Sequence, residues 1–314
     1  MTKVHLEYSQ QIEQLILRGM EISNSFDATL ALKEFGYYNM SGYFYPLRAY
    51  GPSTTKGQIT RLSEFVSGTR IEQIVDLANF DRELRKTLFA GLATFERSLK
   101  SHVAYILGRK SPLAHENINF LHPKTSPEDF LEFQMLYLRD LKISKSEDFV
   151  KHHFDNYGGQ LPIWAAVEVM QFGTISRLID ILPDPDLADI SKEFGFVSRT
   201  LFKSLIGNFR FLRNNCAHHS RTWNLSFRSN FTTSSDHLLK EELLHIQHSP
   251  REKIYSRIAL LAYSLDHVSV GNNFKREVLK LISDFPSMPV CTPEADMGFP
   301  ENLETLQLWA VGNT

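Results

Sequence analysis

The chain has 314 residues, with 34 Lys+Arg against 36 Asp+Glu and a formal net charge of −2. Hydrophobic residues make up 42% of it and charged residues 22%, enough apolar surface to offset chain entropy, which excludes disorder as the main state. No apolar run approaches the roughly 18 residues of a membrane span. The first residues are too polar for a secretory signal, and two cysteines cannot form a four-cysteine zinc site. We therefore expect a cytoplasmic protein that does not bind membranes.

Helical periodicity runs through almost the whole chain. Two helices are expected first, over residues 5–22 and 27–35. Between Arg70 and Leu107 apolar residues recur every three or four positions without a proline, which predicts a helix of roughly 57 Å as the spine of a bundle. Gly91 is the point where we expect this helix to bend or break. Two i,i+4 ion pairs are expected on its solvent side: Asp81 with Arg85 and Glu96 with Lys100.

Further helices are expected downstream, over residues 127–141, 147–154, 162–170, 174–181, 184–194, 198–217, 236–247, 251–267 and 273–284. Capping signals mark several starts: Asp27, Ser126 before Pro127, Ser198, Asp236, and Ser249 before Pro250. Alternating strand-like runs are nearly absent, and residues 51–57 and 109–126 are expected to be loops. The fold class is therefore all-α, as one domain over 1–314. Its core covers approximately 60–285, with an N-terminal helical extension (1–59) and a C-terminal tail (286–314).

The segment from Phe194 to Ser235 contains no Asp or Glu. One interpretation is a solvated basic face, and the other is a site for an anion or phosphate. We favour the second, because the same segment contains the most unusual local sequence of the chain. Its basic residues are Arg199, Lys203, Arg210, Arg213, Arg221 and Arg228, with His218 and His219.

That local sequence is Arg213-Asn-Asn-Cys-Ala-His218, followed by His219-Ser-Arg-Thr-Trp-Asn224. It ends an amphipathic helix whose apolar stripe includes Cys216 and whose opposite side carries Arg199, Lys203, Arg210 and Arg213. Asn and Ser compete for backbone hydrogen bonds, so a polar, helix-loosening patch at the end of an apolar helix often marks function.

The spacing of this motif has a geometric consequence. Residues five apart on a helix differ by about 140° in direction around the axis and by roughly 7.5 Å along it. Arg213 and His218 of one chain therefore cannot easily contact the same small group. Asn214 and His218, four apart, share a face. We therefore expect a homodimer in which a two-fold axis brings two arginines and two histidines onto one phosphate.

The pattern Arg213-Asn214-x-x-x-His218 resembles the Arg-polar-x3–5-His signature of HEPN ribonucleases. Surrounding segments resemble the Abi-like branch of that superfamily, the bacterial abortive-infection proteins. Arg-x4-His alone is common by chance, but the resemblance is specific because these segments run in family order over roughly residues 20 to 230. They are Phe35–Tyr43, Phe80–Arg85, Phe95–Lys100, Leu161–Thr174 (beginning Leu-Pro-Ile-Trp) and Cys216–Asn224 (Cys-Ala-His-His-Ser-Arg-Thr-Trp-Asn).

The resemblance implies a HEPN-like helical bundle, dimerisation through the motif helix, and metal-independent RNA cleavage without a cofactor. In that role His218 exchanges a proton with the ribose 2′-OH or the leaving oxygen, and Arg213 stabilises the phosphorane. Asn214 positions His218 or the phosphate. DNA, which lacks the 2′-OH, should resist cleavage.

Other residues near the motif are expected to support it. His219 is interpreted as a packing or RNA-contact residue, and Arg221 and Asn224 as braces of the motif loop. Arg199, Lys203 and Arg210 are expected to contact the RNA backbone. Glu96 has a counterpart in the family pattern and either bonds the motif helix or forms a salt bridge. Four tyrosines either stack on bases or pack the N-terminal segment onto the bundle, which we favour: Tyr37, Tyr38, Tyr43 and Tyr45.

Alternatives remain open at this point. The motif could be a structural polar cluster at a helix end in a scaffold protein, where cations favour the helix dipole. It could also hold a structured small non-coding RNA without cutting it. His237, Glu241 and His245 share one face of a helix and could bind a metal, although we favour an ordinary solvated face and expect no metal site. Arg221 stands where some HEPN toxins carry a tyrosine that is silenced by nucleotide attachment, so that control is not expected.

Overall fold

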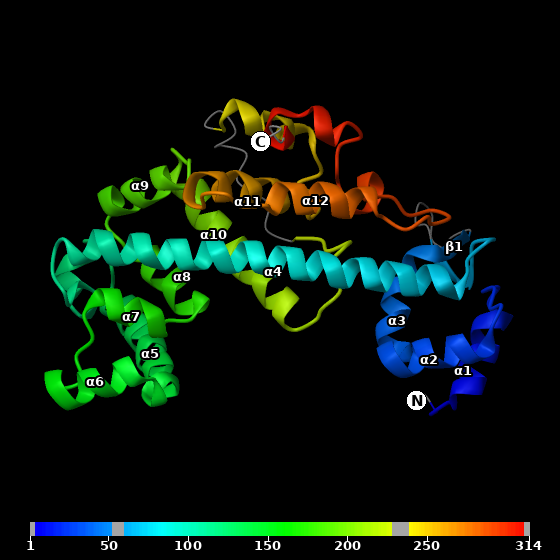
Figure 1. Ribbon diagram of the computed structural model, residues 1–314, viewed down its shortest axis with the longest axis horizontal. Helices are drawn as coiled ribbons and strands as arrows, with labels where there is room; N and C mark the ends of the chain where they lie inside the picture. The colour runs from blue at the N-terminus through cyan, green and yellow to red at the C-terminus, as the bar shows by residue number, and fades with distance from the viewer. Residues whose placement is uncertain (1–3, 52–59, 228–238, 311–314) are drawn as a thin grey trace.

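The computed structural model describes residues 4–51, 60–227 and 239–310, and one long helix, α4 (Ile71–Gly108), runs through it (Figure 1). The predicted spine at 70–107 is therefore confirmed to within one residue at each end. The helix does not break at Gly91. A Cβ atom at Gly91 would lie 2.8 Å from the ring of Phe274 and 3.2 Å from the side chain of Leu261, so glycine allows two later helices to pack closely on α4.

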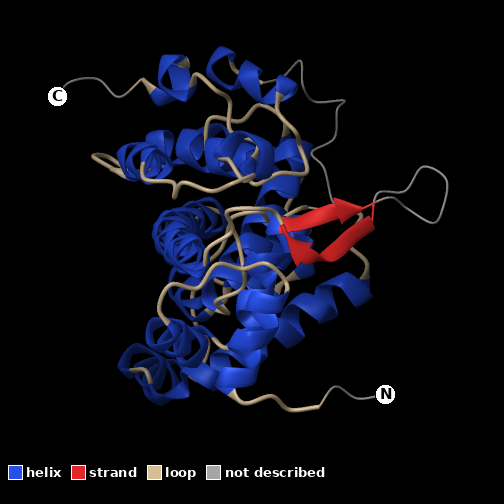
Figure 2. Cartoon of the chain, turned by 90° about the vertical axis from the view of Figure 1, so that its right-hand side faces the viewer, coloured by secondary structure: helices blue, strands red, loops and turns tan. Residues whose placement is uncertain are grey.

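The N-terminal segment packs at one end of α4. Its helices are α1 (Tyr8–Leu17), α2 (Ser25–Phe35) and α3 (Tyr37–Phe44). A two-stranded antiparallel hairpin follows, β1 (Arg48–Gly51) with β2 (Thr60–Phe65), in which Tyr50 pairs with Arg61 (Figure 2). Neither α3 nor the hairpin was expected from the sequence. The N-cap of α2 is Asn24 and not the expected Asp27: the Asn24 side chain accepts from the Phe26 N–H, and Asp27 lies in the first turn of the helix.

The other end of α4 is covered by a second group of helices: α5 (Pro127–Ile143), α6 (Asp148–Tyr157), α7 (Ile163–Val169), α8 (Phe172–Asp180) and α9 (Asp184–Glu193). The predicted cap Ser126 is confirmed, since its hydroxyl accepts from the Asp129 N–H at 3.0 Å. The core runs along α4, where the ring of Phe95 packs on four others: Phe172, Phe194, Phe202 and Phe209.

Three helices complete the bundle: α10 (Arg199–Ala217), α11 (Tyr255–Val268) and α12 (Phe274–Ser283). No helix starts at Ser249-Pro250. Helix α11 begins at Tyr255, and its residues from there through Leu265 are all buried. The helix expected over 236–247 is a 3-10 helix, η6 (Glu241–His248), while the cap Asp236 lies outside the described residues. The C-terminal tail packs back on α11, where Trp309 Nε1 donates to the Tyr255 hydroxyl at 3.0 Å.

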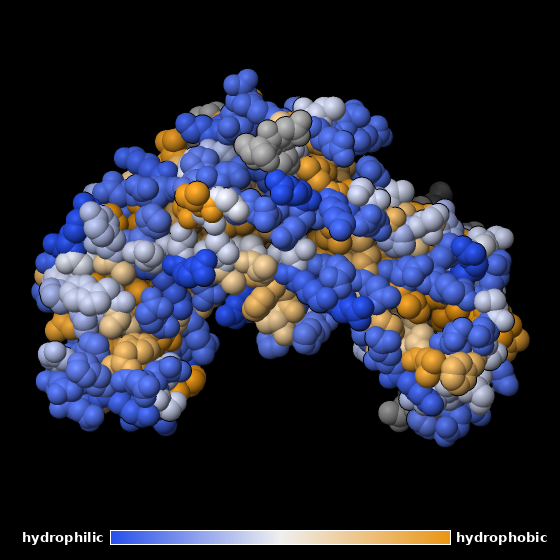
Figure 3. Space-filling model, in the orientation of Figure 1, coloured by the Kyte–Doolittle hydropathy of each residue, from blue (hydrophilic) through white to orange (hydrophobic). Residues whose placement is uncertain are grey.

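The molecule is an arch with two lobes. The lobe of α1–α3 and the lobe of α5–α7 lie at opposite ends of α4, and the surface between them is hollowed (Figures 1 and 3). In this view the C-terminal end of α10 projects between the lobes. The mostly helical class is confirmed. Across the described ranges, no helix is both long and apolar enough to cross a membrane.

One buried histidine makes stability depend on pH. His115, in the 3-10 turn η2 (Ala114–Glu116), is fully buried against Tyr137, and neither ring nitrogen has a hydrogen-bond partner among the described residues. Burial lowers the pKa of His115 to about 4. In the unfolded chain this side chain has a pKa near 6.5, so on acidification it is protonated before the folded protein is. The contribution of neutral His115 to the free energy of unfolding is therefore complete above about pH 6.5 and is lost as the pH falls toward the folded pKa.

We predict that the free energy of unfolding falls by about 2 kcal/mol more in the wild type than in His115→Leu when the pH is lowered from 7.5 to 5. Urea unfolding at the two pH values measures this difference. The control is His152→Leu, at an exposed position on α6. Its pH dependence should match the wild type. Identical pH profiles for the wild type and His115→Leu would contradict the assignment.

Candidate functional site

The motif lies at the C-terminal end of α10. The helix starts at the predicted cap Ser198, whose hydroxyl accepts from the Leu201 N–H at 3.2 Å. Arg213 and Asn214 lie in its last turns, and His218 is the C-cap residue, with its N–H donating to the Asn214 carbonyl at 2.9 Å. Arg213 is partly exposed, while Asn214 and His218 are exposed. The motif is therefore presented to solvent.

His219 reverses the chain directly after the motif. Its φ of 55° is left-handed, and it is the one non-glycine residue with positive φ in the described part of the chain. The His219 N–H donates to the Cys216 carbonyl (3.2 Å) and the Ser220 N–H to the Asn215 carbonyl (3.0 Å), the pair of bonds that closes a Schellman motif. Because this position usually holds glycine, a histidine here stores of the order of 1 kcal/mol of strain.

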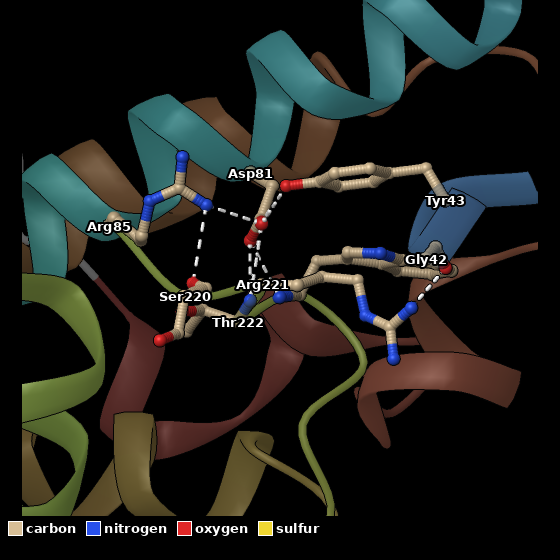
Figure 4. A network of polar contacts seen from close by, with 8 residues as sticks. Gly42, Tyr43, Asp81, Arg85, Ser220, Arg221 and Thr222 are labelled. Atoms are coloured by element: carbon tan, nitrogen blue, oxygen red, sulfur yellow. Dashed lines mark hydrogen bonds and ion pairs between the residues drawn. The ribbon is translucent and has the colours of Figure 1, made fainter. Parts of the chain in front are cut away.

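A buried carboxylate on α4 fixes the loop that follows (Figure 4). Asp81 is fully buried and accepts hydrogen bonds from four groups: the backbone N–H of Thr222 (3.1 Å) and of Trp223 (2.7 Å), the Tyr43 hydroxyl (2.8 Å) and Arg85 Nη1 (2.5 Å). Burial raises the pKa of Asp81, and Arg85 and the other donors oppose that shift. The carboxylate therefore joins α3, α4 and the motif loop.

The two ion pairs expected on the solvent side of α4 are present but lie on its covered side. Asp81 and Arg85 are 0% and 12% exposed, and Glu96 and Lys100, 3.8 Å apart, are 12% and 15% exposed. The expectation of a wet face was wrong because α10 and its loop cover this side of the helix. Charge pairing at i,i+4 is visible in a sequence, but the neighbour that buries it is not.

Arg221 and Asn224 lie in the same loop. Arg221 Nη1 donates to the carbonyl of Gly42 on α3, and a Cβ atom at Gly42 would lie 2.7 Å from that nitrogen, so glycine is needed for the approach. The Asn224 side-chain oxygen is buried without a hydrogen-bond partner among the described residues, and Trp223 is fully buried near Phe285. Arg221 thus ties the loop to the N-terminal lobe.

Arg213 is held against α4 by an acidic partner. Its Nε lies 3.6 Å from a Glu96 carboxylate oxygen, and its Nη1 donates to the Asn214 side-chain oxygen at 3.2 Å. Burial raises the pKa of Glu96, and the charges of Lys100 and Arg213 oppose the shift. Of the two roles weighed for Glu96, the structure shows salt bridges: one to Lys100 on its own helix and one to Arg213 on the motif helix.

Two other basic residues of α10 have partners on neighbouring helices. Arg199 forms an ion pair with Asp184 at 3.0 Å, and Lys203 Nζ donates to the Asp180 carbonyl at 2.9 Å. Arg210 is exposed, and Arg228 lies outside the described residues. The segment without acidic residues in sequence therefore faces carboxylates in space, which reduces the positive charge that sequence alone suggests.

Of the three residues considered as metal ligands, the two that the structure describes do not share a face. His237 lies outside the described residues, and Glu241 and His245 lie in the 3-10 helix η6. A 3-10 helix repeats every three residues, so positions four apart point in different directions. Within the part of the chain that the structure describes, no group of three or more His, Cys, Asp or Glu could hold a metal ion.

The family model described as "Abi-like protein" matches residues 30–224. The chain belongs to this family. The matched region of this Abi-like protein begins within α2, ends at Asn224, and includes the motif, Asp81 and the contacts that Asp81 makes. No curated protein and no solved structure gives a significant match.

We predict that Asp81→Asn destabilises the protein by about 3 kcal/mol, because it leaves the mostly buried Arg85 without its anionic partner and weakens the bonds to the loop. Thermal or urea unfolding measures the change. The matched control is Asp76→Asn, an exposed carboxylate on the same helix, which should stay within about 0.5 kcal/mol of wild type. Equal effects of the two substitutions would show that Asp81 does not anchor the loop.

Proposed function

We propose that this Abi-like protein is a metal-independent endoribonuclease of the HEPN superfamily that acts in bacterial antiphage defence. The observation that carries the proposal is the placement of Arg213, Asn214 and His218. They lie at the exposed C-terminal end of α10, which projects between the two lobes (Figure 1), and the loop that follows them is fixed by a buried carboxylate. A polar cluster that served only to end the helix would not need such an anchor.

The residue types suit cleavage by the RNA's own 2′-oxygen. One imidazole takes the proton of the 2′-OH as its oxygen attacks phosphorus, and a second gives a proton to the departing 5′-oxygen. Arg213 stabilises the charge on the phosphorane, and Asn214 positions His218 or the phosphate. The products are a 2′,3′-cyclic phosphate and a 5′-hydroxyl. The reaction needs two imidazoles near one phosphate, which two copies of His218 would supply.

The exposed stripe of α10 fits a second copy of the same helix. Its residues recur in alternating steps of four and three, the spacing of a helix-pairing seam. Gly207 faces open space, where a Cβ atom would meet nothing within 4 Å, and Phe211 is 48% exposed. The stripe is Thr200, Ser204, Gly207, Phe211, Asn214 and His218. Parallel pairing along it, about a two-fold axis that runs with the helices, would bring both copies of His218 toward that axis.

A second candidate is an RNA-binding protein that holds a structured small RNA without cutting it. The observation that favours it is the state of Arg213, whose guanidinium is already engaged by Glu96 and Asn214. A guanidinium held in this way can bind the phosphate of an intact RNA as well as it can stabilise the phosphorane of a cleavage reaction.

We predict that the protein cleaves RNA but not DNA, in EDTA as well as without it, and leaves 2′,3′-cyclic phosphate ends. His218→Ala should lower the rate by at least about 100-fold, because it removes the group that transfers the proton. The control is His219→Gly, which suits the left-handed backbone of that position and should keep most activity.

Two results would redirect this proposal. Loss of cleavage in EDTA would point to a metal-dependent reaction. Tight binding of a discrete RNA whose ends stay unchanged, with affinity lost in His218→Ala, would favour the second candidate.

The dimer is tested separately. Gly207→Glu should convert the dimer to a monomer and abolish cleavage, because it places a charge in the centre of the stripe. Gly173→Glu on α8, where a Cβ atom also meets nothing within 4 Å, is the matched control and should leave mass and activity unchanged. Light scattering gives the molar mass. A wild type that is monomeric with and without RNA would overturn the shared site.

A further inference from the structure

The N-terminal lobe contains a groove that the motif does not use. It measures about 690 Å³, and we call it the N-terminal groove. Its lining combines aromatic rings and basic groups, and none of the described residues that line it is acidic. The side chains that matter for the argument are Arg18, Tyr37, Tyr38, Ser41, Tyr45 and Arg48.

The tyrosines divide into packing and exposed ones. Tyr43 is buried and bonds Asp81, and Tyr37 is partly buried, as expected for packing onto the bundle. Tyr38 is 93% exposed and Tyr45 is 51% exposed, and both line the groove. The packing that we favoured from sequence therefore does not account for these two rings. An exposed ring pair in a basic groove is the arrangement on which nucleobases stack.

The two arginines are held in place by the hairpin. Arg18 Nε donates to the Ser63 carbonyl (2.6 Å), and Arg48 Nε donates to the Leu62 carbonyl (2.5 Å), both on β2. Arg48 also lies over the ring of Tyr45, 5.7 Å from its centroid. Arg18 Nη1 also donates to the Tyr37 hydroxyl at 3.4 Å. A guanidinium has five N–H donors, so these bonds orient both groups and still leave terminal donors for an anion. Fixed positive charges beside exposed aromatic rings suit a nucleic acid, which has both phosphates and bases, better than they suit a peptide.

Helix α3 connects the groove to the motif loop. Tyr38 and Gly42 are four residues apart and share a face of this helix, and the Gly42 carbonyl accepts from Arg221. Arg221 lies three residues after His218 in the loop that Asp81 fixes. A strand that leaves the groove along α3 would therefore reach Arg221 and then the motif.

We propose that the N-terminal groove binds unpaired nucleotides of an RNA strand. Bases stack on Tyr38 and Tyr45, and phosphates contact Arg18 and Arg48. The inference rests on the proposed function and makes it more specific, because the substrate must then carry a single-stranded segment next to the bond that is cut.

The test measures affinity for a fluorescent single strand of about 12 nucleotides and for a duplex of the same sequence, by anisotropy. All binding variants carry His218→Ala, so that no RNA is cut during the measurement. Tyr38→Ala with Tyr45→Ala should weaken single-strand binding at least about 30-fold and leave duplex binding unchanged. Tyr38→Phe with Tyr45→Phe should bind normally, since stacking needs the ring and not the hydroxyl.

The matched control is Tyr105→Ala with Tyr157→Ala, two exposed tyrosines of α4 and α6. It should bind the single strand as the parent does. If the groove variant binds as tightly as this control, or loses duplex affinity equally, the groove inference is overturned, whether or not the wild type cleaves RNA. If groove-dependent binding is found but the wild type cleaves no RNA, the nuclease proposal fails and the groove inference stands.

Discussion

A single buried carboxylate determines where the motif loop lies. Asp81 joins Tyr43 on α3, Arg85 on α4 and the backbone of Thr222 and Trp223, which are distant in sequence. Removing a carboxylate from water is unfavourable, and that cost is offset only while all its donors are in place. The loop therefore takes this position only when the N-terminal lobe is docked on α4. The family match over residues 30–224 contains every member of this cluster.

Most helices could be predicted because their apolar periodicity is strong and their starts are marked. Ser126 and Ser198 cap their helices as expected, and α4 follows from the spacing of its apolar residues. Helix α3 was missed because Tyr37-Tyr-Asn-Met-Ser-Gly-Tyr-Phe44 is rich in weak helix formers. Its stability comes from tertiary contacts, which include the burial of Met40 and Phe44 and the bond from Tyr43 to Asp81, and local propensity does not report such contacts.

The candidate site was predictable only in part, for a related reason. The motif residues are close in sequence, and their spacing on α10 and family pattern indicated them. The groups that hold them are distant in sequence. Glu96 contacts Arg213 from another helix, and Asp81 bonds a loop that follows it by about 140 residues. Asp81 was visible as half of an i,i+4 pair, but its burial depends on what packs against α4. The groove tyrosines likewise could not be told from packing tyrosines until α3 was placed.

The unbroken course of α4 also limits how the arch can move. Hinges in helices occur at prolines, at bulges or where the hydrogen-bond ladder is interrupted, and α4 continues from Ile71 to Gly108. Both lobes pack on this one rod, so the span between them is set by its length, roughly 57 Å for 38 residues. A bend in α4 therefore cannot bring the two lobes together, and the helix fixes the width of the hollow between them.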